Sequence, residues 1–369
     1  MVGHAIVRDL AAVDDYKVFV ADVDPVALGP LEAAGATGIC IDLSTEENVA
    51  EVVADADLVV SAVPGFMGYD TVEYVLAQKK PIVDISFFEE DAFDLNEAAK
   101  EAGVPCLVDC GIAPGLSNML LGRLEEELDE IDSFECLVGG LPVERTWPWN
   151  YKAPFSPGDV IEVYTRRARR RVNGEEVTVP ALSDIELVDF PGLGTLEAFN
   201  TDGLRSLLLT SDVPNMTEKT MRYPGHAERM RVLREAGFFG DRQVMTESGP
   251  VRPRDVTETL LFSQWRFDEG EPDLTVMRII VEGKQDGVGV RHTFNLLDYY
   301  NPDTETSSMA RTTGYTCTAM VNLVAQGLWT EPGVAPPEIV GRNEACSDFV
   351  LAYLAERKVQ VFRRIEELD

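Results

Sequence analysis

Gly3 and Asp22 stand 19 residues apart near the start of the chain, on either side of a helical pattern and a β-branched run. In a dinucleotide-binding unit, the last glycine of G-x-G-x-x-G lets the first helix pack closely on the sheet. An acidic residue about 20 positions later binds the ribose hydroxyls. The spacing therefore predicts a cofactor site in which Val2 and Gly3 approach the pyrophosphate, while Asp22 and Val23 lie beside the ribose.

The first strand and the first two glycines of such a unit are missing from the sequence, which starts inside the motif. We expect that translation starts upstream and that Met1 is an internal residue. The alternative is a catalytically inactive binding or regulatory relative. In that case a helix at 2–13 would pack against a gap and leave unpaired backbone groups, each costing ~1–3 kcal/mol.

Composition limits the possible partners. The chain of 369 residues carries 64 acidic and 32 basic side chains, a net charge of −32, and such a surface repels nucleic acid and anionic membranes. It has no apolar run of ~20 residues and no signal peptide pattern, so we expect a cytoplasmic protein. Six cysteines without a C-x-x-C pair and three scattered histidines predict no metal site.

From residue 17, short β-branched runs alternate with helical patterns, which predicts a Rossmann-type doubly wound parallel sheet that lacks its first strand. The predicted strands are 17–22, 38–43, 57–64, 81–87 and 105–111, and the predicted helices are 25–34, 44–54, 69–78 and 89–102. We expect a dinucleotide-binding domain at 1–115, which the C-terminal segment 312–369 joins. Ser44 is the expected N-cap of the second of these helices.

After Gly111 the strands become longer and alternate, which predicts an α+β substrate-binding and oligomerisation domain at 116–311 with a mostly antiparallel sheet. The predicted strands are 134–139, 177–179, 185–188, 195–199, 274–282 and 288–296. Helices are expected after Gly115 through Leu128, at 312–326 and at about 344–368. The turn Asn173-Gly174 follows a basic run, Arg166 to Arg171, which we interpret as a solvated hairpin.

The carboxyl ends of parallel strands face the ligand crevice, so the residues there are cofactor candidates. These are Ala62, Val63, Pro64, Ser86 and Asp109. The carboxylate of Asp22 would repel a 2′-phosphate, which favours NAD over NADP.

The second domain contains the parts of an amino-acid site. Arg222 can fork a carboxylate, Asp202 can accept an ammonium group, and Lys152 or His226 can move a proton. Gly140 and Tyr223 lie in the same polar clusters and complete the candidate substrate site.

Seven ordered motifs resemble the saccharopine dehydrogenase family, and most closely its lysine 6-dehydrogenase branch. They are Ser61-Ala62-Val63-Pro64-Gly65-Phe66, Asp109-Cys110-Gly111-Ile112-Ala113-Pro114-Gly115, Val138-Gly139-Gly140-Leu141-Pro142, Tyr151-Lys152, Thr201-Asp202-Gly203-Leu204-Arg205-Ser206, Arg222-Tyr223-Pro224-Gly225-His226 and Ala310-Arg311-Thr312-Thr313-Gly314. The resemblance covers essentially the whole chain.

The resemblance implies NAD(P)-linked oxidation of a C–N bond at the side-chain end of lysine or of an N-substituted lysine. Arg222 would grip a substrate carboxylate, Ser86 would lie near the nicotinamide, and Lys152, Asp202 and His226 would line the reacting amine. We expect NAD-dependent oxidative deamination of the ε-amino group of L-lysine to 2-aminoadipate 6-semialdehyde. The alternative is a saccharopine or carboxynorspermidine dehydrogenase, which joins an aldehyde to an amine with NAD(P)H.

The resemblance implies that the saccharopine reductase branch carries an aspartate before Pro-Gly, where this chain has Ala113. The alanine makes saccharopine, a bulky substrate with a glutamate half, less expected. The family resemblance also implies association through the long sheet, and we expect a homodimer or larger homo-oligomer. The apolar residues expected to be exposed before that sheet are Leu260, Leu261, Phe262, Trp265 and Phe267.

Overall fold

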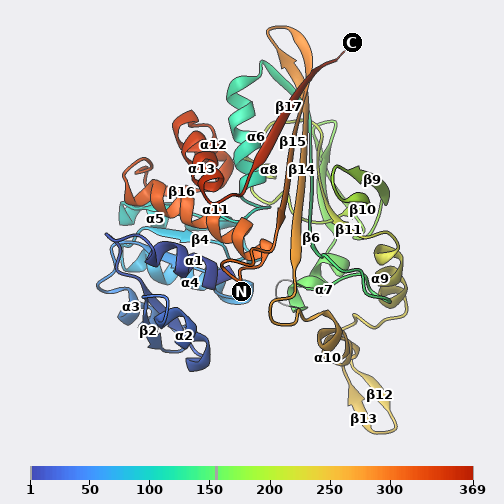
Figure 1. Ribbon diagram of the computed structural model, residues 1–369, viewed down its shortest axis with the longest axis horizontal. Coiled ribbons are helices and arrows are strands. Elements are labelled where there is room, and N and C mark those ends of the chain that lie inside the picture. Colours follow the sequence, from blue (N-terminus) through green and yellow to red (C-terminus); the bar gives the residue numbers. More distant parts are fainter. Residues whose placement is uncertain (1, 154–156, 369) are drawn as a thin grey trace. The chain divides into compact units, whose positions relative to one another are not determined.

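The computed structural model describes residues 2–153 and 157–368, which fold into two compact units (Figure 1). The first unit comprises 1–128 and 310–360, and the second comprises 129–309 and 361–369. The sequence pattern predicts boundaries at 115/116 and 311/312, so the helix at 116–127 and the strand at 361–367 belong to the opposite unit from the one predicted. That helix packs closely against the segment around Glu338 in the first unit. A Cβ at Gly122 would lie only 2.0 Å from the Glu338 backbone oxygen, so this contact requires glycine.

The parallel strands of the first unit form two separate sheets. The four-stranded sheet has the order β16-β5-β4-β3, and β1 pairs in parallel with β2. The gap between the two sheets lies between β1 and β3, which is where a doubly wound sheet has its first strand. The strands are β1 (Phe19–Asp22), β2 (Thr37–Cys40), β3 (Val59–Ser61), β4 (Ile82–Asp84), β5 (Pro105–Leu107) and β16 (Gly333–Ala335).

Helices pack on these strands through a fully apolar core. Val72, Val75, Ile82 and Cys106 are completely buried in it. The helices of this unit are α1 (Val2–Ala11), α2 (Pro25–Glu32), α3 (Glu46–Val53), α4 (Gly65–Ala77), η1 (Ala92–Leu95), α5 (Asn96–Ala102), α6 (Leu116–Glu127), α11 (Ser308–Ala325), α12 (Pro337–Gly341) and α13 (Glu344–Glu356). This arrangement confirms the predicted α/β class.

The start of α3 differs by one residue from the prediction. The N-cap is Thr45, whose Oγ1 accepts a hydrogen bond from the Asn48 backbone nitrogen at 3.4 Å. Ser44, the expected cap, instead donates its backbone N–H to Asp42 at 2.9 Å. The aspartate turn therefore fixes Ser44 before the helix begins.

A nine-stranded mixed sheet dominates the described part of the second unit, with the path β17-β15-β14-β6-β11-β10-β9 and the β7–β8 hairpin attached to β11. Only β6 and β11 pair in parallel, so the sheet is mostly antiparallel as predicted. Figure 1 shows β14 and β15 as a long antiparallel pair. The strands are β6 (Glu130–Pro142), β7 (Ala168–Val172), β8 (Glu175–Val179), β9 (Glu186–Phe190), β10 (Gly194–Asn200), β11 (Met216–Arg222), β14 (Asp273–Gln285), β15 (Val288–Tyr299) and β17 (Val361–Glu367).

The prediction of one helix over 344–368 is wrong in its second half. The helix α13 ends at Glu356, the backbone turns through a positive φ of 63° at Lys358, and β17 pairs antiparallel with β15. The predicted turn at Asn173 and Gly174 is confirmed, because it joins β7 to β8. The basic run before it is only partly solvated, since Arg171 donates to the backbone oxygens of Leu208 and Ser211.

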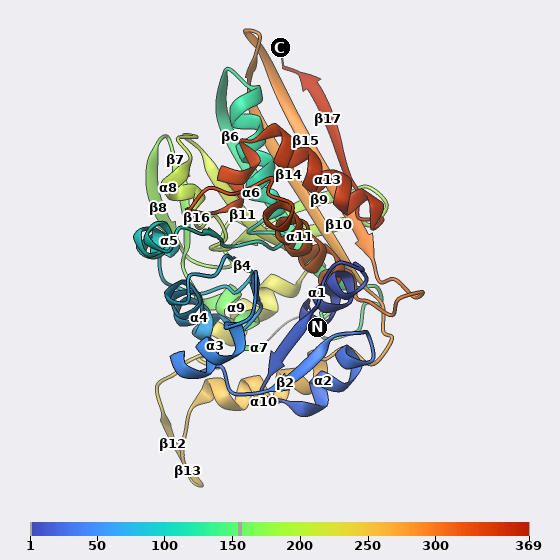
Figure 2. The same ribbon diagram turned by 90° about the vertical axis from the view of Figure 1, so that its left-hand side faces the viewer.

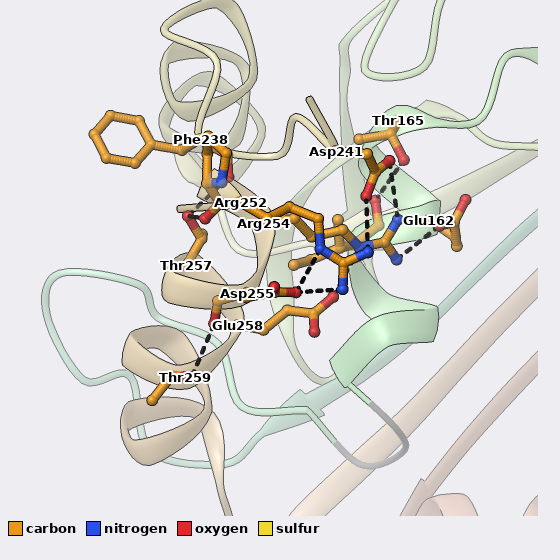
Figure 3. Close-up of polar contacts among 12 residues, drawn as sticks. Glu162, Thr165, Phe238, Asp241, Arg252, Arg254, Asp255, Thr257, Glu258 and Thr259 are labelled. Atoms are coloured by element: carbon orange, nitrogen blue, oxygen red, sulfur yellow. Dashed lines mark hydrogen bonds and ion pairs between the residues drawn. The ribbon is translucent and has the colours of Figure 1, made fainter. Parts of the chain in front are cut away.

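A small hairpin, β12 (Val244–Thr246) and β13 (Gly249–Val251), extends from the second unit beside α10 (Pro253–Trp265) (Figure 2). Its base is held by charged pairs: Arg254 bonds to Glu162 of α7 at 2.7 Å, and Arg252 bonds to Asp255 (Figure 3). The remaining helices of this unit are α7 (Pro157–Thr165), α8 (Leu207–Thr210) and α9 (His226–Glu235).

The apolar residues expected to be exposed on α10 divide between its two sides. Leu261 and Trp265 are buried in an aromatic core, whereas Leu260 is 59% exposed and Phe262 is 37% exposed. The expectation of exposure therefore fails for the two residues that face the core, because they are four residues apart on one side of the helix. No helix in the described residues is long and apolar enough to cross a bilayer.

Candidate active site

The predicted cofactor residues of the first unit begin at the carboxyl end of β1. Asp22 is half-buried, and its Oδ1 accepts the Asp24 backbone N–H at 2.8 Å. Burial lowers the pKa of His4, in the first turn of α1, and the charge of Asp22 opposes that shift, so the two groups lie within electrostatic range. A helix start and an acid at a strand end are the two parts that hold the pyrophosphate and the ribose of a dinucleotide. The residues present thus fit the cofactor.

The second row of predicted cofactor residues follows β3. Ala62 and Pro64 are exposed, and Pro64 directly precedes α4. Glycine is required at the start of this helix, because a Cβ at Gly65 would meet the Phe87 backbone oxygen at 2.4 Å. The segment Ala62, Val63, Pro64 therefore presents backbone and small side chains to solvent, as a bound dinucleotide requires.

Ser86 and Asp109 follow the next two strands, and both are buried. The Ser86 hydroxyl donates to the carboxylate of Asp84 at 2.7 Å, and the same carboxylate accepts the Ser86 backbone N–H at 3.0 Å. Burial raises the pKa of Asp84 to about 7, while the hydrogen bonds from Ser86 oppose the shift. Ser86 therefore points toward Asp84, a buried acid that the sequence analysis did not select.

Arg222 ends β11 in the second unit and is 3% exposed. Its guanidinium lies 4.5 Å from the ring centre of Tyr151, and its Nη1 donates to the Met221 backbone oxygen at 2.9 Å. The Nε is buried without a hydrogen-bond partner, and no carboxylate pairs with Arg222 among residues 2–153 and 157–368. A buried cation without an anion is costly unless a ligand supplies one, which fits the predicted carboxylate-binding role.

His226, at the start of α9, is fully buried and bonded on both ring nitrogens. Its Nε2 lies 2.8 Å from the Tyr164 hydroxyl and its Nδ1 lies 3.0 Å from the Trp149 backbone oxygen. Burial, with the charge of Arg222, lowers the pKa of His226 to about 3. A base this weak is neutral at working pH and has little driving force to take a proton, so the environment disfavours the predicted proton-transfer role of His226.

The other two predicted catalytic residues are held in separate ion pairs. Lys152 is bonded to Glu271 and lies 4.0 Å from Asp268. The guanidinium of Arg169 donates to both carboxylate oxygens of Asp202 at 3.0 Å, and the Arg169 backbone N–H donates to Oδ1 at 3.0 Å. No bond in the described residues joins Lys152, Asp202 and His226 to one another.

Two predicted substrate residues have structural contacts. The Tyr223 hydroxyl donates to the Pro142 backbone oxygen at 2.9 Å, and the guanidinium of Arg145 lies 4.0 Å from the Tyr223 ring centre. Gly140 is buried in β6 opposite Thr275. Tyr223 therefore fixes the end of β6, beside the predicted site.

A buried acid that the sequence analysis missed lies on the same strand as Arg222. Glu218 is 7% exposed, and its Oε2 accepts a hydrogen bond from Thr201 at 2.6 Å. Burial raises the pKa of Glu218 to about 7, and the charge of Arg222 opposes the shift. The spacing 218, 220, 222 would have shown that Glu218 and Arg222 share a face, but only once the segment was known to be a strand.

Two family models match the chain. The Saccharopine dehydrogenase NADP binding domain matches residues 1–107, and the Saccharopine dehydrogenase C-terminal domain matches residues 111–359. The chain belongs to the saccharopine dehydrogenase family. The resemblance drawn from the seven motifs is therefore confirmed at the level of the family.

Relatives of known activity match the chain over most of their length. The Saccharopine dehydrogenase [NADP(+), L-glutamate-forming] of Pyricularia oryzae is 23% identical, with 87% of each chain covered. The protein of the same name from Schizosaccharomyces pombe is also 23% identical, with 81% of this chain and 83% of that protein covered. Both names carry NADP(+), the cofactor that the sequence analysis placed second.

Solved structures share the fold at low identity. Apo saccharopine dehydrogenase (L-Glu forming) from Saccharomyces cerevisiae superposes with a TM-score of 0.83 at 19% identity, covering 99% of this chain and 97% of that one. The homospermidine synthase from Legionella pneumophila in complex with NAD gives a TM-score of 0.68 at 12% identity, covering 99% and 89%. The fold of a saccharopine dehydrogenase thus extends over nearly the whole chain.

Proposed function

We propose that the protein is an NAD(P)-dependent oxidoreductase that breaks or forms the C–N bond of a saccharopine-type substrate, a secondary amine joining lysine to a second amino acid. The buried, carboxylate-free guanidinium of Arg222 carries this proposal, because it offers a site for an amino-acid carboxylate. The names of the full-length fungal relatives support the substrate class.

For the cofactor, we propose NAD. Asp22 ends β1, Asp24 follows it, and Asp42 lies after β2, so three carboxylates lie near the place of the adenosine ribose. A 2′-phosphate would be repelled there. The relatives named for NADP(+) make this choice the part of the proposal that most needs measurement.

The chain's own residues would bind and orient the substrate, while the bound nicotinamide accepts or supplies the hydride. Arg222 would hold a carboxylate against Tyr151. Lys152 and Asp202 remain the proposed proton-handling groups, each released from its ion pair by the substrate. His226, which is neutral, would fix the hydroxyl of Tyr164.

The second candidate is a lysine 6-dehydrogenase, which acts on the free ε-amino group. Ala113, before Pro114 and Gly115, favours it, because a methyl group replaces the acid expected beside a larger substrate. Reductive condensation with a diamine, as in a carboxynorspermidine dehydrogenase, is the third.

Formation of reduced cofactor, followed at 340 nm by absorbance, separates the first two candidates. L-saccharopine with NAD should give a kcat/KM at least ~10-fold above that of L-lysine, a difference worth about 1.4 kcal/mol. The same assay with NADP tests the cofactor. Faster turnover of L-lysine alone would move the assignment to the second candidate, and no turnover of either would refute the proposed function.

A further inference from the structure

One face of β11 carries two opposite charges that do not neutralise each other. Glu218, Thr220 and Arg222 alternate along the strand and so share one face. Glu218 and Arg222 are both more than nine-tenths buried. Four residues of strand separate their backbones by roughly 13 Å, and no ion pair joins them in the described residues.

The surroundings of Glu218 are built from hydroxyl and backbone donors. Thr201 donates to its carboxylate at 2.6 Å, and Thr201 lies 2.9 Å from the hydroxyl of Thr220. A Cβ at Gly203 would lie 2.6 Å from the carboxyl carbon, so glycine allows the turn to close over the acid. The motif Thr201-Asp202-Gly203 therefore encloses Glu218, while Asp202 itself bonds to Arg169.

Other charged groups near this face are already paired. Glu197 lies opposite Arg222 on β10, but its carboxylate accepts the backbone N–H groups of Gly225 and Ala227 at the start of α9. Within the described ranges, no lysine, arginine or histidine lies at ion-pair distance from Glu218. The face thus has one acid without a cation and one guanidinium without an anion.

We propose that Glu218 and Arg222 together recognise the zwitterionic head group of an α-amino acid, with Glu218 binding the ammonium group and Arg222 the carboxylate. This inference rests on the proposed function. It adds Glu218 as the residue that recognises the α-ammonium group of the substrate. It assigns the free head group of the lysyl half of the substrate to this face. Glu218 should therefore make the protein bind L-lysine, which has an α-amino group, more tightly than 6-aminohexanoate, which lacks one.

The pH dependence follows from the state of Glu218. Burial raises its pKa to about 7, so the carboxylate that attracts an ammonium group predominates only above that pH. Affinity for the head group should therefore rise from pH 6 to pH 8.5. Of the nearby charged groups, Asp202 bonds to Arg169, Glu197 accepts the N–H groups at the start of α9, and Arg222 remains a cation across this range. Glu218 is the group on this face whose pKa lies inside the range.

The test is calorimetric titration of L-lysine and of 6-aminohexanoate into the full-length protein with NAD, at pH 6 and pH 8.5. At pH 8.5 the wild type should bind L-lysine at least ~10-fold more tightly than 6-aminohexanoate, as expected for a charged hydrogen bond. Glu218→Gln should reduce this ratio below ~3-fold and remove its pH dependence.

Glu135→Gln is the matched control. Glu135 is also an acid whose pKa burial raises, but it lies opposite Thr217 and so on the other face of the sheet. It should keep the wild-type ratio. Retention of the ratio by Glu218→Gln, or failure of the wild type to bind L-lysine or to distinguish it from 6-aminohexanoate, would overturn the inference.

A second variant covers the case in which Glu218→Gln does not fold. Thr201→Val removes the hydroxyl that lowers the pKa of Glu218, so the pH at which L-lysine affinity rises should move upward. An unchanged midpoint would also overturn the inference. Turnover of L-saccharopine is measured separately, so a wild type that turns over L-saccharopine but does not distinguish L-lysine from 6-aminohexanoate rejects this inference and leaves the proposed function standing.

Discussion

Asp84 in the first unit and Glu218 in the second are both enclosed acids whose pKa burial raises to about 7. Their neighbours differ. Asp84 is bonded by Ser86 and lies near a second acid, Asp109, and the thiol of Cys106. Glu218 shares its strand face with the guanidinium of Arg222, which pairs with no carboxylate in the part of the chain that the structure describes.

The difference separates two uses of a buried carboxyl. The hydrogen bonds to the Asp84 carboxylate come from the hydroxyl and the backbone N–H of Ser86, so the acid fixes the turn that follows its own strand. Glu218 is held on one side by Thr201, while its counter-charge lies further along the same strand. The first arrangement is complete in the protein, whereas the second needs a ligand with charges of both signs.

Removal of the counter-charge should have the largest effect. Arg222→Gln should lower kcat/KM for the amino-acid substrate by at least ~100-fold, since truncating one member of a buried charge pair costs about 2–5 kcal/mol. Steady-state kinetics at pH 8.5 measure it. Arg278→Gln, on the opposite face and bonded to Asn295, should stay within ~3-fold of wild type. A similar loss in both variants would remove the distinction between Arg222 and other arginines of the sheet.

Asp22, which is half-buried, is the acid expected to determine the choice between NAD and NADP. Asp22→Ser should narrow the preference for NAD over NADP by roughly 10- to 100-fold, because the repulsion of a 2′-phosphate is lost with the carboxylate. Ratios of kcat/KM with the two cofactors give the answer. A wild type that already prefers NADP would show that Asp22 serves only the turn in which it accepts the Asp24 N–H.

The last prediction concerns stability rather than activity. The pKa of Asp84 rises from 3.8 to about 7 in the folded protein, so the folded state holds a proton that the unfolded state releases. Stability should therefore fall as the pH rises from about 4 to about 7, on the order of 4 kcal/mol in total. Asp84→Asn removes this dependence.

Melting temperatures of Asp84→Asn and wild type, measured at pH 5 and pH 8, test that sign. The variant should gain several degrees relative to wild type between the two pH values, at roughly 2–4 °C for each kcal/mol. Glu218→Gln should show the same trend, because both acids are buried. A difference that does not change with pH would mean that Asp84 does not titrate in this range.

The sequence predicted the elements whose pattern is local. The runs that became β1, β4 and β14 are β-branched or alternate, and their flanking turns are clear. Strand β11 was missed because Met216–Arg222 reads Met-Thr-Glu-Lys-Thr-Met-Arg, without a β-branched run. It forms because β6 and β10 flank it, contacts that come from distant parts of the chain.

In the candidate site too, the sequence predicted the chemistry of single residues but not their contacts with distant parts of the chain. The chemistry of Arg222 follows from its residue type and motif, and its burial agrees with that interpretation. The ion pairs of Lys152 and Asp202 involve Glu271 and Arg169, which are 119 and 33 residues away, so no motif could show them. The weak basicity of His226 likewise depends on burial by the fold.

The separate β1–β2 sheet also determines where the molecule opens first. Phe19 of β1 is 60% exposed, whereas Ile82 and Val83 of β4 are completely buried. Two-stranded sheets are marginal by themselves, and amide hydrogens exchange through local opening of the weakest segments. Amides of β1 and β2 should exchange with deuterium well before those of β4. A dinucleotide bound at Asp22 would then slow exchange in β1 and β2 more than in β4, whose residues Ile82 and Val83 are already buried.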